Sequence, residues 1–238
     1  MLIKKLFIHI PKNAGMTIRR SDKLLNSIYH VSNPQDLISP QYVENLKKTM
    51  VKSGDAPNMN ATSAAYGYGH CRWRDIKPGV RTSMDCFAVV RNPWDRVVSR
   101  YFFAKKLIEH EKKAPASKHD ISSFEAFLEE RHKWGEVEYM WHRAVRGWYP
   151  QLDYVADKDG NLKCDIMRFE KLDKDICSYF KIMKMTEPRN VTGLNKQSYK
   201  DLYTKETIQI VADWYKKDID TFGFDFDTCA TKNIWSKF

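Results

Sequence analysis

The chain has 238 residues, of which 42% are apolar and 13% aromatic, and 40 Lys and Arg against 30 Asp and Glu give a formal net charge of +10. This composition excludes a disordered or low-complexity chain, and the length favours one domain over residues 1–238 with a sizeable core. The longest apolar runs, such as residues 87–90, are only as long as a strand, so no transmembrane helix is predicted.

The predicted elements alternate between strand and helix early in the chain. In chain order they are a buried strand over 2–10, a helix over 17–29, a helix over 40–52, a loop over 55–65, a short strand over 65–71, a buried strand over 85–91, helices over 93–113, 122–134 and 139–149, a hairpin of 154–155 with 162–169 around Asp159-Gly160, and helices over 171–185 and 204–222. This order predicts an α/β fold, with a P-loop-like parallel sheet flanked by helices on both faces and a helical C-terminal part.

The ends and the cysteines limit the class of protein. The apolar part of residues 1–10 is too short for a signal peptide, and the five cysteines are widely spaced with no CxxC pair. The lysine pairs are scattered rather than gathered in a basic block. We therefore expect a soluble, cytoplasmic protein without a disulfide framework or a bound metal, and with neither nucleic acid nor membrane as partner.

The first candidate site is the loop after the first predicted strand, which reads PKNAGMT over residues 11–17. A strand that leads through such a loop into a helix forms an anion site, because backbone N–H groups and the helix dipole favour negative charge. Gly15 allows close approach of the backbone, Lys12 adds a charge and Thr17 a donor. The lysine precedes the glycine, so the loop is not a Walker A motif. An ordinary strand–turn–helix with a surface lysine is the competing interpretation.

The second candidate site follows the strand over 85–91. Arg91 stands at the carboxyl end of this strand, where open parallel sheets bind ligands, and Ser99 lies about two turns into the next helix, near Arg96 and Arg100. A guanidinium fork and a hydroxyl together hold a phosphate. The competing interpretation pairs Arg91 with a carboxylate and leaves Ser99 as a packing residue.

Together the two motifs resemble those of the sulfotransferases that use 3′-phosphoadenosine 5′-phosphosulfate (PAPS), above all the carbohydrate and uronosyl 2-O-sulfotransferase branch. Segments 150–154, 167–172 and 215–224 extend the resemblance over nearly the whole chain, whereas Asn13 and Met16 depart from the family's PKTAGTS-like loop. The resemblance implies that the first loop binds the 5′-phosphosulfate, that Arg91 and Ser99 bind the 3′-phosphate, and that Asn195 lies in a loop over the nucleotide. The implied cofactor-binding residues are Pro11, Lys12, Asn13, Ala14, Gly15, Met16, Thr17, Arg91, Ser99 and Asn195.

The resemblance also implies the chemistry, which is metal-free, in-line transfer of a sulfuryl group from PAPS to an acceptor hydroxyl. His70 matches the catalytic histidine of the branch, and the ordinary pKa of histidine, near ~6.5, suits a general base. The competing interpretations are a hydrogen-bonded loop histidine and Glu170 as the base. Lys12 would stabilise the leaving oxygen. Arg72, Gln151 and Glu170 are candidate contacts to the acceptor. The resemblance favours a glycan, either acidic or neutral, and a lipid, a protein tyrosine and a small glycoside stay open as alternatives.

Three other functions remain open on the sequence. A P-loop-like nucleotide kinase shares the sheet topology but lacks the Walker A order of residues. A nucleotide-binding pseudoenzyme of the same fold would keep both phosphate motifs without turnover. A nucleic-acid-binding protein would account for the positive charge but has no recognisable motif here.

Overall fold

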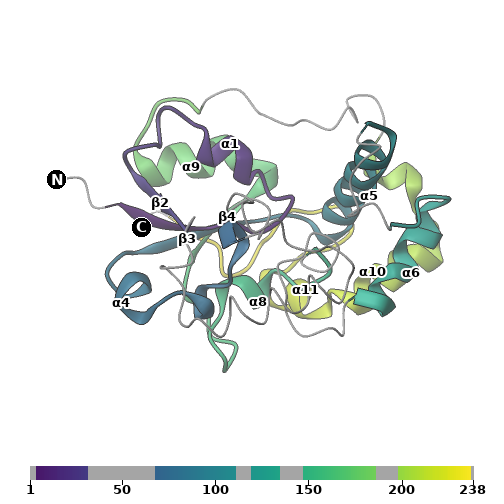
Figure 1. Ribbon diagram of the computed structural model, residues 1–238. Helices are drawn as coiled ribbons and strands as arrows, with labels where there is room; N and C mark the ends of the chain where they lie inside the picture. Colours follow the sequence, from purple (N-terminus) through teal and green to yellow (C-terminus); the bar gives the residue numbers. More distant parts are fainter. Residues whose placement is uncertain (1–3, 32–67, 111–118, 135–146, 186–197, 237–238) are drawn as a thin grey trace, which may run out of the picture.

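A computed structural model describes residues 4–31, 68–110, 119–134, 147–185 and 198–236 (Figure 1). The helix predicted over 40–52, the loop over 55–65, most of the helix over 139–149, and Asn195 lie outside the described residues. In the described part, the small elements that the sequence did not predict are the 3-10 turns η2 (Tyr68–His70), η3 (Trp73–Asp75), η5 (Phe169–Lys171) and η6 (Tyr199–Leu202) and the short helix α4 (Pro78–Arg81).

The described core is built on a parallel sheet of four strands in the order β2-β1-β3-β4. The strands are β1 (Lys5–Ile8), β2 (Ile28–His30), β3 (Cys86–Val90) and β4 (Asp165–Arg168). All five residues of β3 are buried, as expected for a central strand covered on both faces. The prediction of a parallel sheet is confirmed, and the predicted strands over 2–10 and 85–91 correspond to β1 and β3.

Helices cover both faces of the sheet, as predicted (Figure 1). On one face lie α1 (Gly15–Arg19) and α9 (Leu172–Phe180), which pack Ile18 and Ile176 against Phe7 and Phe87. On the other face lie α8 (Leu152–Val155) and α11 (Lys216–Phe222), whose Tyr154 and Phe222 join the larger core with Leu6, Ile8 and Ala88. Alternate residues of β1 and β3 therefore enter two separate cores.

A helical group stands beside the sheet and contains α5 (Pro93–His110), α6 (Phe124–Trp134) and α10 (Lys205–Trp214) (Figure 1). Trp94 connects α5 with α10 and the residues before it. Its indole Nε1 donates to the Ile208 carbonyl at 3.0 Å, and the backbone carbonyl of Trp94 accepts from the Tyr203 hydroxyl at 2.9 Å. Asn92 caps α5, and its Oδ1 accepts from the Trp94 amide at 3.0 Å. Among the described residues, none of the helices has the length and apolarity needed to cross a bilayer.

Two predicted elements of the N-terminal part were wrong. The helix expected over 17–29 ends at Arg19, and a series of turns leads to β2, which pairs with β1 in parallel. Pairing with the sheet and burial of Leu24 outweigh the local helical pattern. The strand expected over 65–71 is, where described, the turn η2.

Two predicted elements of the C-terminal part differ as well. The Asp159-Gly160 turn is present, with Gly160 at φ 85°, but a single bridge between Ala156 and Leu162 closes it, because residues 154–155 belong to α8. The last helix is broken at Tyr215, which has φ −104° and ψ 25°. This break separates α10 from α11, and the buried Asp218 of α11 accepts from the amides of Gln151 and Leu152.

Candidate active site

The two predicted anion motifs meet at the carboxyl ends of neighbouring strands. Strand β1 pairs with β3, with Ile8 opposite Ala88, although β2 follows β1 in the described chain. The connection after β1 therefore leaves toward one edge of the sheet and that after β3 toward the other. In open α/β sheets such a reversal opens the crevice in which ligands bind.

The first loop has an unusual backbone that is fixed by packing. Lys12 and Ala14 both have positive φ, 70° and 59°, which costs a non-glycine residue on the order of 1 kcal/mol. Such conformations cluster at functional sites, where the surrounding structure maintains them. Gly15 opens α1 and lies directly under the ring of His9, since a Cβ atom there would come 1.7 Å from His9 Nε2.

Substituting Gly15 with alanine should destabilise the protein by roughly 1–3 kcal/mol, because the buried His9 ring has to move. The free energy of unfolding in urea measures this effect. Gly79→Ala is the matched control, since a Cβ atom at Gly79 meets nothing within 4 Å. Equal stabilities of the two variants would show that the His9 contact does not shape the loop.

Lys12 lies in positively charged surroundings. Its Nζ stands 4.3 Å from the centroid of the Phe103 ring. Burial, followed by the charges of Arg91, Arg100 and Lys106, lowers the pKa of Lys12 to about 7. The three neighbouring charges that shift it are all cations, so an anion at this point would relieve both the repulsion and the desolvation.

Arg91 joins the second motif to the first. Its Nη1 donates to the carbonyl of Lys12 at 2.9 Å, while Nε and Nη2 donate to the carboxylate of Asp95 at 2.7 and 2.8 Å. Its guanidinium lies 4.0 Å from the centroid of the Phe169 ring. The carboxylate pairing that competed with phosphate binding is thus present. Three of the five guanidinium N–H groups are engaged in these bonds, which leaves two that can meet an anion.

The residues of α5 near Arg91 are buried. Ser99 is 3% exposed and Arg96 is 1% exposed. Arg96 donates to the carbonyls of Pro11 at 3.2 Å and Tyr149 at 3.0 Å. It therefore supports the backbone of the first loop and does not line the site.

His70 reaches the site from η2. Its Nδ1 donates to the carbonyl of His9 at 2.8 Å, and the two rings lie 4.0 Å apart. His30 supports this turn by donating from Nε2 to the Gly69 carbonyl at 2.9 Å, and its pKa is lowered to about 4 by burial, then by Arg19. His9 itself is buried, with 5% of its surface exposed. The structure therefore brings His70 against the end of β1, next to the loop that carries Lys12.

Comparison with known families agrees with this geometry. A sequence profile described as "Sulfotransferase family" matches residues 4–225, which include every element of the site described above. The chain belongs to the sulfotransferase family. A search of curated proteins found no significant match.

The predicted acceptor contacts of this sulfotransferase are all engaged with protein groups. Arg72 forms a fork with Asp75, at 2.7 and 2.8 Å. Glu170 is exposed as a residue, but its carboxylate turns inward to accept from the Asn92 amide at 2.7 Å, and desolvation raises its pKa. Gln151 is 0% exposed. Both atoms of its side-chain amide are bonded to Asn13 and Arg91, and this pairing argues against contact with a substrate.

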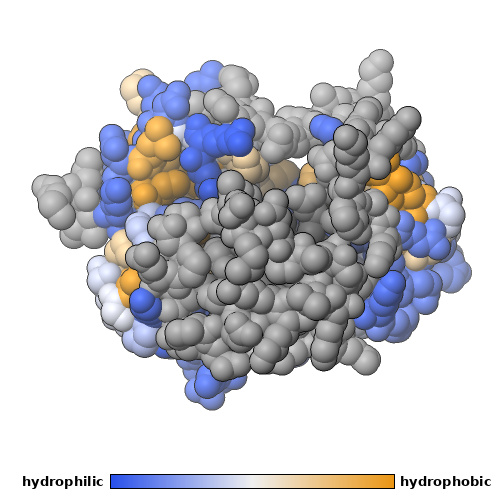
Figure 2. Space-filling view, viewed as in Figure 1, coloured by the Kyte–Doolittle hydropathy of each residue, from blue (hydrophilic) through white to orange (hydrophobic). Residues whose placement is uncertain are grey.

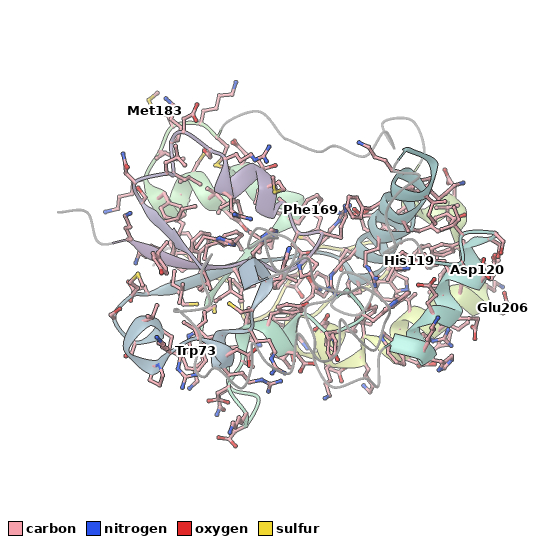
Figure 3. All side chains as sticks on the ribbon, in the orientation of Figure 1. Trp73, His119, Asp120, Phe169, Met183 and Glu206 are labelled. Carbon is pink, nitrogen blue, oxygen red and sulfur yellow. The ribbon has the colours of Figure 1, made fainter. Side chains whose placement is uncertain are left out.

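Sequence reasoning missed several residues of the site. Asp95 was not predicted as a partner of Arg91, although its carboxylate accepts two hydrogen bonds from the Arg91 guanidinium. Phe103 and Phe169 carried no signal, because each meets its cation only through the tertiary fold. Figure 3 shows Phe169 near the centre of the molecule, between α1 and α5. Within the described ranges, no group of three or more His, Cys, Asp or Glu is placed to hold a metal ion.

Proposed function

We propose that this sulfotransferase transfers a sulfuryl group in line from PAPS to an acceptor hydroxyl on a carbohydrate. The observation that carries the proposal is the junction of Lys12 and Arg91 at the carboxyl ends of adjacent strands, where the Arg91 guanidinium donates to the backbone carbonyl of Lys12 at 2.9 Å. A donor with two phosphate groups suits two such cations. We also propose one domain over residues 1–238, in keeping with the profile match over 4–225.

PAPS supplies an activated sulfuryl group, and the chain supplies positioning and charge. Lys12 is proposed to stabilise the oxygen that leaves, with the first loop contacting the 5′-phosphosulfate through residues 11–17. Arg91, held by Asp95 and Phe169, is proposed to contact the 3′-phosphate together with Ser99. The fit is supported by the cationic surroundings of Lys12 and by the two guanidinium N–H groups that Arg91 retains.

His70 is proposed as the general base. The carbonyl of His9 can only accept, so the neutral ring of His70 carries its proton on Nδ1 and its lone pair on Nε2. Nε2 would accept the proton of the attacking hydroxyl. Glu170 is the alternative base, but its carboxylate already accepts from the Asn92 amide at the start of α5.

The product nucleotide, 3′-phosphoadenosine 5′-phosphate (PAP), should raise the melting temperature in the absence of Mg²⁺. At a concentration of 100 times its Kd the expected rise is roughly 5–10 °C. Arg91→Ala and Lys12→Ala should abolish it, whereas Lys216→Ala, which changes a side chain of α11 that is 72% exposed, is a control that should retain it. Stabilisation by ATP with Mg²⁺ and none by PAP would favour a nucleotide kinase instead.

The acceptor class needs a separate measurement, since a carbohydrate is proposed only from the resemblance of the motifs to one branch of the family. Incubation with radiolabelled PAPS and a panel of neutral and acidic glycans, with tyrosine peptides, lipids and small glycosides alongside, identifies the acceptor directly. Label on a peptide or lipid alone would overturn the carbohydrate assignment. Binding of PAP without transfer to any member would favour a pseudoenzyme.

A further inference from the structure

A buried amide side chain joins the two anion motifs. Gln151 Oε1 accepts from Asn13 Nδ2 at 2.6 Å and from the Arg91 amide at 2.9 Å, and Gln151 Nε2 donates to the Arg91 carbonyl at 2.8 Å. Asn13 Nδ2 also donates to the Val89 carbonyl at 2.7 Å. Gln151 is 0% and Asn13 1% exposed. We call these hydrogen bonds the Gln151 link.

The Gln151 link is itself anchored by α11, which lies on the same face of the sheet as α8. The amides of Gln151 and Leu152 donate to the carboxylate of Asp218, at 2.8 and 2.9 Å. Asp218 belongs to α11 and is 0% exposed. Water therefore has little access to replace these bonds, and breaking one leaves a buried polar group without its partner.

We propose that Gln151 is a positioning residue that fixes the distance between the two anion sites. The inference rests on the proposed function, because it assumes that Lys12 and Arg91 hold the two ends of one ligand. Asn13 lies next to Lys12 in the first loop, and Gln151 forms hydrogen bonds with both the backbone N–H and the backbone carbonyl of Arg91. The side chain thereby fixes the position of the end of β3 relative to the first loop. The single hydrogen bond between Arg91 and Lys12 constrains that position less.

Only a side-chain amide of this length forms all three hydrogen bonds, to Asn13, to the Arg91 N–H and to the Arg91 carbonyl. A carboxylate accepts from Asn13 and from the Arg91 amide but cannot donate to the Arg91 carbonyl, and an alkyl chain does none of these. Asn13 replaces the residue that the family's PKTAGTS-like loop has at this position, so the tie to the loop is a feature of this chain's own sequence.

The role predicts a specific pattern of binding. When two sites are held at a fixed separation, a ligand bound at one site meets the second at a high effective concentration. A ligand that reaches both sites therefore gains affinity. Loosening the separation removes that gain but leaves each separate contact nearly intact. A purely structural defect, in contrast, weakens every ligand alike.

The test compares PAP with 5′-AMP and 3′-AMP by calorimetry on Gln151→Glu and on Gln209→Glu, an exposed glutamine of α10 that serves as control. Gln151→Glu should lower the affinity for PAP by roughly 10- to 100-fold and the affinity for each monophosphate by less than about threefold. Gln209→Glu should match the wild type for all three ligands. If Gln151→Glu does not fold, Asn13→Ala removes only the tie to the loop and should give the same pattern with a smaller loss.

The outcomes separate this inference from the proposed function. Equal losses for all three ligands, or none, would overturn the positioning role while the wild type still prefers PAP. A wild type that binds PAP no better than the monophosphates would instead overturn the proposed two-phosphate site.

Discussion

Replacing His70 with alanine should lower the rate of sulfuryl transfer by roughly 10²- to 10⁴-fold while leaving the affinity for PAP near that of the wild type. The hydrogen bond to the His9 carbonyl sets the tautomer, so the substitution removes the proton acceptor without removing a cation that holds phosphate. Transfer of radiolabel to the identified acceptor gives the rate, and calorimetry with PAP on the same preparation gives the affinity.

Two further variants make this result decisive. His132→Ala is the matched control, since His132 lies on the surface of α6 with its side chain 59% exposed, and its rate should equal that of the wild type. Glu170→Gln keeps an oxygen that accepts from the Asn92 amide but cannot act as a base. A large loss in Glu170→Gln together with full activity in His70→Ala would transfer the base role to Glu170.

The parts of the fold that could be predicted are those in which local pattern and tertiary packing agree. The runs at 6–8 and 86–90 are apolar throughout because both faces of these strands are covered, and the Asn92-Pro93 start of α5 satisfies its own backbone. Strand β2 could not be predicted, since its three residues become a strand only through pairing with β1. The break at Tyr215 comes three residues before Asp218, whose carboxylate accepts from the amides of residues 151–152, more than 60 positions away, and a local pattern does not contain such a contact.

The candidate site likewise has parts that a local sequence pattern predicts and parts that depend on tertiary contacts. The two loops could be recognised because a strand followed by a cationic loop and a helix is a local arrangement. Their junction could not, since the Arg91–Lys12 bond spans 79 positions and requires β3 to lie beside β1. Gln151 was predicted as a substrate contact in a segment that resembles one of the family's. Its hydrogen bonds to Asn13 and Arg91 reverse that interpretation, and only the fold reveals them.

Binding of PAP should weaken as the pH rises above 7, by up to about tenfold per pH unit. In the unliganded protein, burial and the neighbouring cations lower the pKa of Lys12 to about 7, so the residue is largely neutral at pH 8 to 9. A bound phosphate raises that pKa again, because an opposite charge favours the protonated amine. Binding above pH 7 must therefore include the uptake of a proton, which becomes scarcer as the pH rises.

Calorimetry at pH 7, 8 and 9 measures this dependence, and repeating it in buffers of different ionisation enthalpy counts the protons taken up. The phosphates of the ligand have a second pKa near ~6, so they are ionised throughout this range and contribute little. Lys12→Arg is the control, since a guanidinium stays charged, and its affinity for PAP should be nearly constant from pH 7 to 9. An equal slope in the two proteins would assign the pH dependence to another group.

Without ligand, the same lysine should act on stability in the opposite direction. In the unfolded chain Lys12 holds its proton up to about pH 10.4, so between pH 7 and 10 the unfolded state binds more protons than the folded state. The contribution of Lys12 to the free energy of unfolding therefore rises with pH across the range in which PAP binding weakens. Urea unfolding of the wild type and of Lys12→Arg at pH 7 and 9 measures this, and the wild type should gain more from the rise in pH. Opposite slopes for stability and for affinity, both reduced in Lys12→Arg, are expected only if one buried amine carries both effects.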